Sequence, residues 1–381
     1  CDAGYRTGIV GKTHLWRHGE GHASDHEQEM HDWGFIDARE TTGPSESLLT
    51  DSRYTDHLAS RGLLDAHRQY FEMYLRGARP FPWELPPTPL PTQDHLDVFI
   101  GSLAQVWIEE CPDDKPFYLQ VNFGGPHDPW DAPPEYRSLY NPDDIPVSAR
   151  GQRTGPLSPH VQLLLEHAPN KLHKMGTAQS QLLKANYYSK VTLIDDCVGA
   201  IVQTLKDRSL LDNTWIVFSS DHGEMLGDHG LLAKKVFYEG AVNVPCLFRP
   251  PNGQGQGSTD ALVNHLDIVA TLIDICGAAP LQDSPSQSIA PLLRGESATS
   301  HRQAVLSELG LPPSAFVMVR TNEHKLSADA KTREPIELYD LAEDPAELHN
   351  LIEREDYAEI RQHLLTDVMN PMLSRLDTTA W

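Results

Sequence analysis

Residues 219–230 combine residue types that could bind a cation. The segment reads Ser-Ser-Asp-His-Gly-Glu-Met-Leu-Gly-Asp-His-Gly and directly follows the apolar run Trp-Ile-Val-Phe at residues 215–218. Such a run is typical of a strand buried on both faces, and ligands of open α/β sheets bind where strands of this kind end. Asp221 and His222 are therefore candidate metal ligands. The alternative is that Asp221 caps a helix and that His222 packs against the loop.

Lysine and histidine side chains mark three other segments. Lys234 lies in the run Leu-Leu-Ala-Lys-Lys-Val-Phe-Tyr-Glu, where an ammonium group would suit an oxyanion next to a metal ion. Lys12 and His14 follow a short apolar run in Gly-Ile-Val-Gly-Lys-Thr-His-Leu, and the period of two of a strand aims both the same way. His127 lies in Gly-Gly-Pro-His-Asp-Pro, after a predicted strand. Taken singly, Lys12 is most often a solvated charge and His127 a turn histidine.

Strands and helices alternate around these segments. Residues 117–123 and 215–218 are predicted strands, and apolar side chains from Tyr187 to Leu205 recur at steps of three and four, which predicts a helix between the strands. Two further helices are predicted from the same periodicity, at residues 96–107 and 269–276. The alternation predicts an α/β fold with a large, mostly parallel or mixed sheet flanked by helices.

The pattern of elements changes after about residue 295. Short strands are predicted there at residues 304–306, 316–320 and 336–341. A helical stretch follows Pro345. We therefore predict two domains, a catalytic α/β domain over residues 1–295 and a small C-terminal domain with an antiparallel sheet over residues 296–381.

The composition limits the classes of partner. The chain has 381 residues and a net charge of −23, and it has no run of about 18 apolar residues. An acidic protein of this kind is not expected to bind nucleic acid broadly, and none of its helices is expected to span a membrane. Five cysteines at irregular spacing and the lack of Asn-x-Ser/Thr acceptors slightly favour the cytoplasm, while export remains open.

The order of the four polar segments resembles that of sulfatases of the alkaline phosphatase superfamily. That family shares a Gly-Lys-x-His segment, a Pro-His-x-Pro segment, an Asp-His/Asn-Gly segment and a Lys before a Tyr-Glu and Val-Pro stretch, and this chain has all of them in order. The resemblance covers nearly all of the chain. It implies an alkaline-phosphatase-like fold and hydrolysis of a small-molecule or carbohydrate sulfate monoester to an alcohol and inorganic sulfate. It also implies these roles: catalysis by His14 and His127, sulfate binding by Lys12 and Lys234, and metal coordination by Asp221 and His222.

The resemblance implies two cofactors. A carboxylate such as that of Asp221 suits a hard ion, so Ca²⁺ is favoured, with Mg²⁺ or Mn²⁺ as substitutes. The family's nucleophile is a formylglycine made within a Cys-x-Pro-x-Arg or Ser-x-Pro-x-Arg motif, which follows an Asp-Asp pair upstream of the segment at Lys12. This chain has neither feature there, and none of its five cysteines begins such a motif. We therefore expect both in an N-terminal segment missing from this sequence, and we expect this chain alone to be inactive.

Two other functions stay open. A phosphonate monoester or phosphodiester hydrolase of the same superfamily would share every motif quoted above. A noncatalytic, sulfatase-like binding protein would fit if the complete gene lacks the nucleophile motif.

Three regularly spaced histidines follow the segment of Lys12 and His14. His18, His22 and His26 recur at steps of four and could bind a transition metal on one face of a helix. Gly19 and Gly21 disfavour that helix, so we expect a loop at the entrance of the site instead.

Overall fold

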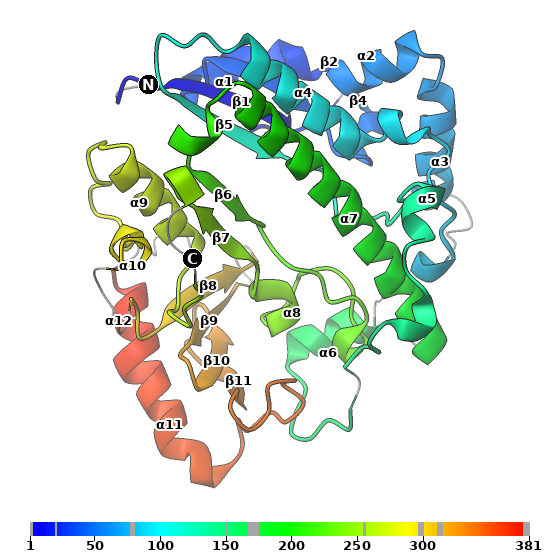
Figure 1. Cartoon of the computed structure of the whole chain (residues 1–381). Coiled ribbons are helices and arrows are strands. Elements are labelled where there is room, and N and C mark those ends of the chain that lie inside the picture. The colour runs from blue at the N-terminus through cyan, green and yellow to red at the C-terminus, as the bar shows by residue number, and fades with distance from the viewer. Residues whose placement is uncertain are drawn as a thin grey trace. The chain divides into compact units, whose positions relative to one another are not determined.

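The computed structural model describes residues 3–19, 21–76, 81–149, 151–166, 175–253, 257–295, 301–310 and 315–375. Contacts within the chain divide it into two units (Figure 1). Unit 1 comprises Cys1–Val147 and Lys174–Thr214, and unit 2 comprises Ser148–His173 and Trp215–Trp381. The predicted domain boundary near residue 295 falls inside unit 2 and stays a prediction.

Unit 1 is built on a parallel sheet. β1 (Arg6–Lys12) lies between β3 (Asp37–Thr41) and β5 (Phe117–Asn122), which gives the strand order β3-β1-β5. β1 is parallel to both neighbours, and its Gly11 pairs with Asn122 of β5. β5 confirms the strand predicted in this part of the chain. Because parallel strands end at the same edge of a sheet, the segments after β1 and β5 leave the sheet as neighbours.

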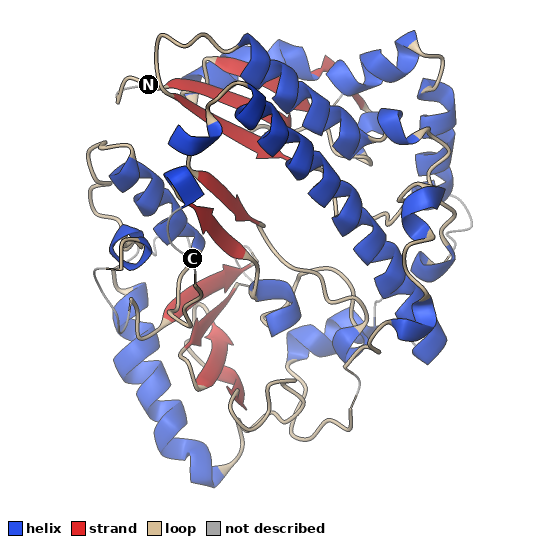
Figure 2. Ribbon diagram, viewed as in Figure 1, coloured by secondary structure: helices blue, strands red, loops and turns tan. Residues whose placement is uncertain are grey.

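Helices cover both faces of this sheet (Figure 2). α4 (Leu96–Glu110), a predicted helix, packs on the face toward which Gly8 points. α1 (Glu27–Asp32) covers the opposite face, where Ile9 packs against Met30. Successive residues of a strand point to opposite faces, so Gly8 and Ile9 show that the sheet is the middle layer of unit 1.

The other elements of unit 1 complete this layer structure. They are β2 (Gly21–His22), β4 (Thr50–Asp51), α2 (Arg53–Ser60), α3 (Leu64–Arg76), α5 (Pro134–Arg137) and α7 (Thr177–Asp207). β2 and β4 form a separate parallel pair, and α7 packs along α4.

α7 confirms the predicted helix, but its buried face differs from the predicted apolar stripe. Val191, which belongs to that stripe, is 43% exposed, whereas the neighbouring Lys190 is 1% exposed. Lys190 is buried because its ammonium group lies 3.1 Å from the Asp131 carboxylate. The sequence pattern misses the burial of Lys190 because its partner Asp131 lies 59 residues away in the sequence.

Gly8→Ala is expected to destabilise the protein by roughly 1–3 kcal/mol, the usual cost of overpacking a core. A Cβ atom at Gly8 would stand 2.5 Å from the Trp107 ring, and Trp107 is only 2% exposed. Gly199→Ala is the matched control, because Gly199 is exposed on α7 and has no atom within 4 Å of its Cβ position. Alanine at that helix position should stabilise by roughly 0.5–1 kcal/mol. Urea unfolding measures both changes, and an unchanged midpoint for Gly8→Ala would contradict the packing of α4 on β1.

Unit 2 contains two antiparallel sheets. β6 (Ile216–Ser219) pairs with β7 (Cys246–Arg249), and the other sheet has the strand order β11-β10-β9-β8. The strands of this second sheet are β8 (Val305–Leu309), β9 (Phe316–Arg320), β10 (His324–Asp329) and β11 (Pro335–Asp340). β6 and three of these four strands confirm predicted strands, whereas β10 is a strand that the sequence patterns do not predict.

Short helices surround the sheets of unit 2. They are α6 (Pro159–Glu166), α8 (Glu239–Val242), α9 (His265–Ile275), α10 (Ala290–Leu293), α11 (Ala358–His363) and α12 (Asn370–Leu373). α9 confirms a predicted helix. The core of the larger sheet joins Val317, Leu326 and Leu338 to Leu364 and Met369 from the C-terminal helical stretch. The predicted fold class is therefore confirmed: α/β with a parallel sheet, and a small antiparallel sheet toward the C-terminus.

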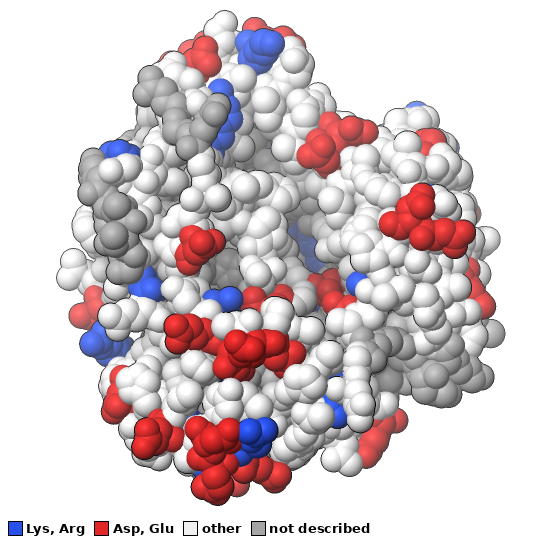
Figure 3. All heavy atoms as spheres, turned by 60° about the horizontal axis from the view of Figure 1, so that its bottom comes forward, with Lys and Arg blue, Asp and Glu red and all other residues white. Residues whose placement is uncertain are grey.

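The surface is acidic, in line with the net charge of −23, and Figure 3 shows this for one face. Over the stretches that the structure describes, none of the helices is long and apolar enough to cross a bilayer.

Candidate active site

Lys12 is the last residue of β1 and lies at the edge of the sheet where β5 also ends. Its side chain runs past Gly43. A Cβ atom at Gly43 would stand 2.9 Å from Lys12 Cε and would overlap the Glu46 carboxylate. Glycine at position 43 therefore leaves room for a lysine and a carboxylate side by side at this edge.

His14 lies between two residues that are anchored to the buried Glu40. Thr13 Oγ1 donates to one carboxylate oxygen of Glu40, and Trp16 Nε1 donates to the other at 2.8 Å. Glu40 is 4% exposed, and burial raises its pKa despite these two donors. The backbone on either side of His14 is therefore fixed, whereas the imidazole itself is exposed.

The three histidines spaced by four do not form a helical metal site. The chain makes a 3₁₀ turn at Ala23–His26, and His22 caps its start while His22 Nε2 lies 3.2 Å from the Asp56 carboxylate. His26 instead stacks on Trp16, with the ring centroids 3.7 Å apart. His18 contacts the same Trp16 ring, with centroids 4.4 Å apart, while His22 contacts Asp56. The segment is therefore irregular, as expected from the two glycines.

His127 lies in the loop after β5, and the next residue holds its ring. His127 Nδ1 lies 2.9 Å from the Asp128 carboxylate and 2.9 Å from the Asp128 carbonyl oxygen. The Tyr74 hydroxyl donates to the other oxygen of that carboxylate at 2.7 Å. An imidazole whose Nδ1 donates to a carboxylate presents Nε2 for proton transfer, so Nε2 is the atom of His127 that can act on a ligand.

Asp221 and His222 follow β6 directly. The Asp221 side chain is 84% exposed, and one of its carboxylate oxygens accepts from His222 N at 3.0 Å. The other oxygen lies 3.5 Å from His222 Nε2. His222 Nδ1 lies 2.8 Å from the Gly223 carbonyl oxygen, which can only accept, so Nδ1 is the donor and Nε2 is the ring nitrogen left to bind a metal ion.

This pair fits one side of a cation site. Two ligand atoms of one Ca²⁺ or Zn²⁺ ion lie about 3–4 Å apart, given the usual bond lengths, and the 3.5 Å between Asp221 and His222 Nε2 falls in that range. The Nδ1 proton on a backbone carbonyl is the usual arrangement around a metal-bound histidine. Within the residues that the structure describes, no third Asp, Glu, His or Cys completes a cluster. The pair therefore supplies part of a coordination shell.

Lys234 lies in a loop that closes on its own start. Met225 N donates to the Ala233 carbonyl oxygen at 3.0 Å, and Ala233 N donates to the Glu224 carboxylate. These two bonds bring the residue before Lys234 against the residues that follow the His222 segment. The loop thus returns the chain just before Lys234 to Glu224 and Met225, two and three residues after His222.

The far end of this loop is fixed by the C-terminal sheet. Lys325 of β10 is 2% exposed and donates to the Phe237 carbonyl oxygen at 2.8 Å. Its ammonium group also lies 2.6 Å from the carboxylates of Glu239 and Glu347. Burial alone would raise the pKa of Glu239, but Lys325 holds it below its usual value. At Glu347 burial dominates and raises the pKa despite the same lysine.

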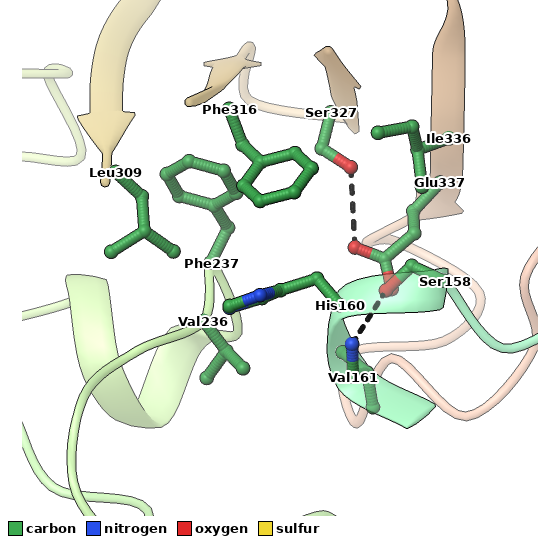
Figure 4. Close-up of a pocket in the computed structure, with 10 residues that line it drawn as sticks. All are labelled: Ser158, His160, Val161, Val236, Phe237, Leu309, Phe316, Ser327, Ile336 and Glu337. Atoms are coloured by element: carbon green, nitrogen blue, oxygen red, sulfur yellow. Dashed lines mark hydrogen bonds between the residues drawn. The ribbon is translucent and has the colours of Figure 1, made fainter. Parts of the chain in front are cut away.

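A pocket of unit 2 lies behind this loop and contains none of the predicted site residues (Figure 4). Its polar wall is Glu337, whose carboxylate accepts from Ser327 Oγ at 3.2 Å and whose pKa is raised by burial. The aromatic rings of Phe237 and Phe316 form part of its apolar wall. Val236 and Phe237 of the Lys234 loop line this pocket, and none of the predicted catalytic or metal-binding residues does.

The structure brings the predicted residues together in two groups. In unit 1, the parallel strands β1 and β5 carry Lys12 and the loop of His127 to one edge of the sheet. In unit 2, the closed loop brings Ala233, the residue before Lys234, to Met225, four residues after Asp221. That the two groups form a single site stays a prediction.

Sequence patterns miss the residues that orient these groups. Glu40 and Lys325 are buried and reach their partners across long stretches of chain, so no local motif marks them. Asp128 does carry a signal, because it directly follows His127 and both lie between two prolines.

Two family models match the chain. The model described as Sulfatase matches residues 2–278, and the model described as N-sulphoglucosamine sulphohydrolase, C-terminal, matches residues 227–372. The first match includes all of the predicted site residues.

One relative and two solved structures show how far the similarity extends. Choline-sulfatase of Rhizobium meliloti (strain 1021) is 30% identical over 243 residues, which are 63% of this chain and 47% of that protein. The phosphonate monoester hydrolase of Agrobacterium radiobacter has a TM-score of 0.74 at 22% identity and covers 98% of this chain and 79% of its own. A structure in complex with D-glucosamine-2-N,6-O-disulfate has a TM-score of 0.68 at 19% identity and covers 100% of this chain and 81% of its own. The two structures share the fold, and the chain spans about half the length of the curated relatives it matches.

Proposed function

Because this chain belongs to the sulfatase family, we propose that the complete protein hydrolyses a sulfate monoester to an alcohol and inorganic sulfate. The observation that carries this proposal is the match of the sulfatase family model to residues 2–278, which include Lys12, His127 and Asp221. The similarity to choline-sulfatase supports the same class of reaction.

The proposed substrate is a small-molecule or carbohydrate sulfate ester. The glucosamine disulfate in one neighbouring structure supports a sulfated sugar, and the choline-sulfatase relative supports a small ester. With a net charge of −23, the protein must hold an anionic ester with a local group of cations. We assign Lys12 and Lys234 to the sulfonyl oxygens, where fixed positive charges offset the negative charge that shifts as the ester bond breaks.

His127 is the general acid in this proposal. Its Nε2 donates a proton to the ester oxygen of the leaving alcohol while the bond between sulfur and that oxygen breaks. Asp128 holds Nδ1 and stabilises the ring when it is charged, and Tyr74 fixes the Asp128 carboxylate. We assign His14 as the base that accepts the proton of the nucleophile's second hydroxyl group when sulfate is released, since an imidazole titrates near neutral pH.

Asp221 and His222 Nε2 would hold the divalent cation that sulfatases generally use. Ca²⁺ is the favoured ion because the carboxylate is a hard ligand, and Mg²⁺ or Mn²⁺ are substitutes. When bound, the ion would supply positive charge that polarises the oxygens of the sulfate group. The 3.5 Å between the two ligand atoms and the Nδ1 proton on the Gly223 carbonyl support this assignment.

The formylglycine nucleophile has no position in this chain. None of its Cys or Ser residues begins a Cys-x-Pro-x-Arg or Ser-x-Pro-x-Arg motif. We assign the nucleophile to a segment outside this sequence, and the half-length coverage of the curated relatives supports that assignment.

Sulfate release by the complete gene product tests the proposal. The complete protein is expected to release sulfate from 4-nitrophenyl sulfate and from a sugar sulfate, to lose this activity after chelation, and to regain it with Ca²⁺. The 381-residue chain alone is expected to release none. Ion chromatography measures free sulfate in both cases. Release by the 381-residue chain would refute the assignment of the nucleophile, and no release by the complete protein would refute the sulfatase proposal.

The same protein sample separates the two alternatives. A phosphonate monoester hydrolase, the class of one structural neighbour, would have a higher kcat/KM for a phenyl phosphonate monoester than for any sulfate ester. A noncatalytic binding protein would release heat on binding a sulfate ester in a calorimeter and would leave the ester intact.

A further inference from the structure

The loop that carries His127 is tied at both ends to buried charged side chains. Gly125 N donates to Asp97 Oδ1 at 2.8 Å, and Lys190 Nζ donates to the Pro129 carbonyl oxygen at 3.2 Å. Asp97 lies in the first turn of α4, and Lys190 lies in the middle of α7. Two helices therefore hold the two ends of a loop of five residues, 125–129.

Lys190 joins the two attachments into one cluster. Its Nζ lies 3.1 Å from Asp131 Oδ1 and 3.9 Å from Asp97 Oδ2. Lys190 and Asp97 are each 1% exposed, and Asp131 is 5% exposed. His95 contacts the same two carboxylates, because its Nε2 lies 3.6 Å from Asp131 Oδ1 and its Nδ1 lies 3.6 Å from Asp97 Oδ2. Water does not screen charges at this depth, so the ammonium group is held in place by both carboxylates.

Lys190 and the carboxylates around it each favour the charged form of the other. Burial alone would raise the pKa of Asp131, but Lys190 and then His95 hold it well below its usual value. Burial alone would lower the pKa of Lys190, but Asp131 and Asp97 raise it. Lys190 therefore stays an ammonium group, which can donate to the loop and to a carboxylate at once.

Core stability does not account for this cluster. Burying charges removes their hydration, so a buried ion pair is often no more stabilising than apolar side chains of the same volume. The backbone groups that Lys190 and Asp97 contact across segments belong to Gly125 and Pro129, on either side of His127. Gly125 itself permits the close approach, because a Cβ atom there would stand 2.7 Å from Asp97 Oδ2.

We propose that Lys190 is a positioning residue for His127. Together with Asp97, it fixes both ends of the loop, so that the imidazole held by Asp128 meets the leaving oxygen of the ester in one orientation. The kinetic part of this inference rests on the proposed sulfatase function, whereas the structural part does not.

Leaving-group kinetics on the complete protein test the proposal. Lys190→Met should slow hydrolysis of an alkyl sulfate on the order of 10-fold to 10²-fold more than hydrolysis of 4-nitrophenyl sulfate, because a displaced general acid matters most for a poor leaving group. In a His127→Ala background, Lys190→Met should add no further selectivity, since both changes act through one group.

Lys184→Met is the matched control. Lys184 is another buried lysine of α7, 9% exposed, but its Nζ donates to the Val147 carbonyl oxygen at 3.5 Å. This variant should slow both esters equally or leave both unchanged. If Lys190→Met does not fold, Lys190→Met/Asp131→Asn takes its place, because it removes one buried carboxylate together with the ammonium group.

Hydrogen exchange supplies a readout that does not depend on activity. In Lys190→Met, the amides of the non-proline residues in 124–131 should exchange at least about 10-fold faster than in the parent protein, while Lys184→Met leaves them unchanged. Unchanged exchange, or equal slowing of the alkyl and nitrophenyl esters, would overturn the assignment of Lys190. A parent protein that cleaves neither ester would instead refute the sulfatase function, and the exchange rates would still decide the role of Lys190.

Discussion

His127→Ala in the complete protein is expected to slow alkyl sulfates on the order of 10²-fold more than 4-nitrophenyl sulfate, the usual size of general acid catalysis. An alkyl alcoholate must be protonated as the bond to sulfur breaks, whereas a nitrophenolate leaves readily without help. Only the slow ester therefore depends on the Nε2 proton.

Steady-state kinetics with a series of esters of increasing leaving-group pKa measure this selectivity. His363→Ala is a suitable control, because the His363 side chain is 63% exposed on α11. This control variant should leave the rate of hydrolysis of both kinds of ester unchanged. Equal slowing of alkyl and nitrophenyl esters by His127→Ala would mean that His127 binds the sulfate group and does not protonate the alcohol.

Lys234→Ala is expected to lower kcat/KM for both kinds of ester by about 10²–10³, the range found when one fixed group that stabilises developing charge is removed. The loss should be similar for alkyl and nitrophenyl esters, because the sulfonyl oxygens are common to both. Lys235→Ala is a control of the same chemistry one residue away, and Lys235 is exposed. It should leave kcat/KM unchanged. Equal losses in the two variants would show that general positive charge, and not the position of Lys234, binds the sulfate.

Local patterns predict several helices and strands well. α4 has apolar residues at helical spacing and β9 is a short apolar run, and the positions of both match the prediction closely. β10 is the counterexample. Its polar residues Lys325 and Ser327 are buried because they meet Glu347 and Glu337, which lie in later segments. No short window of sequence contains both partners of these pairs. A search for apolar residues at strand spacing therefore does not detect β10.

The same limit applies to the candidate site. The residues that could act on an ester lie in contiguous motifs, so their types and order can be read from the sequence. Their supports are pairs far apart along the chain, such as Thr13 with Glu40 and Lys190 with Asp131. A lysine in a helix is expected at the surface, and only its three-dimensional partner explains why Lys190 is buried.

The attachment of the Lys234 loop to β10 has a consequence for biosynthesis. Lys325 lies 88 residues after Phe237, whose carbonyl oxygen it holds, and Glu347 lies 108 residues after Glu239. At roughly 5–20 residues per second, the ribosome releases the loop about 4–18 seconds before the lysine that anchors it. During that interval the nascent loop has no anchor at its far end and is open to chaperones and proteases. A premature stop codon before β10 would therefore leave the Lys234 loop translated but without its anchor.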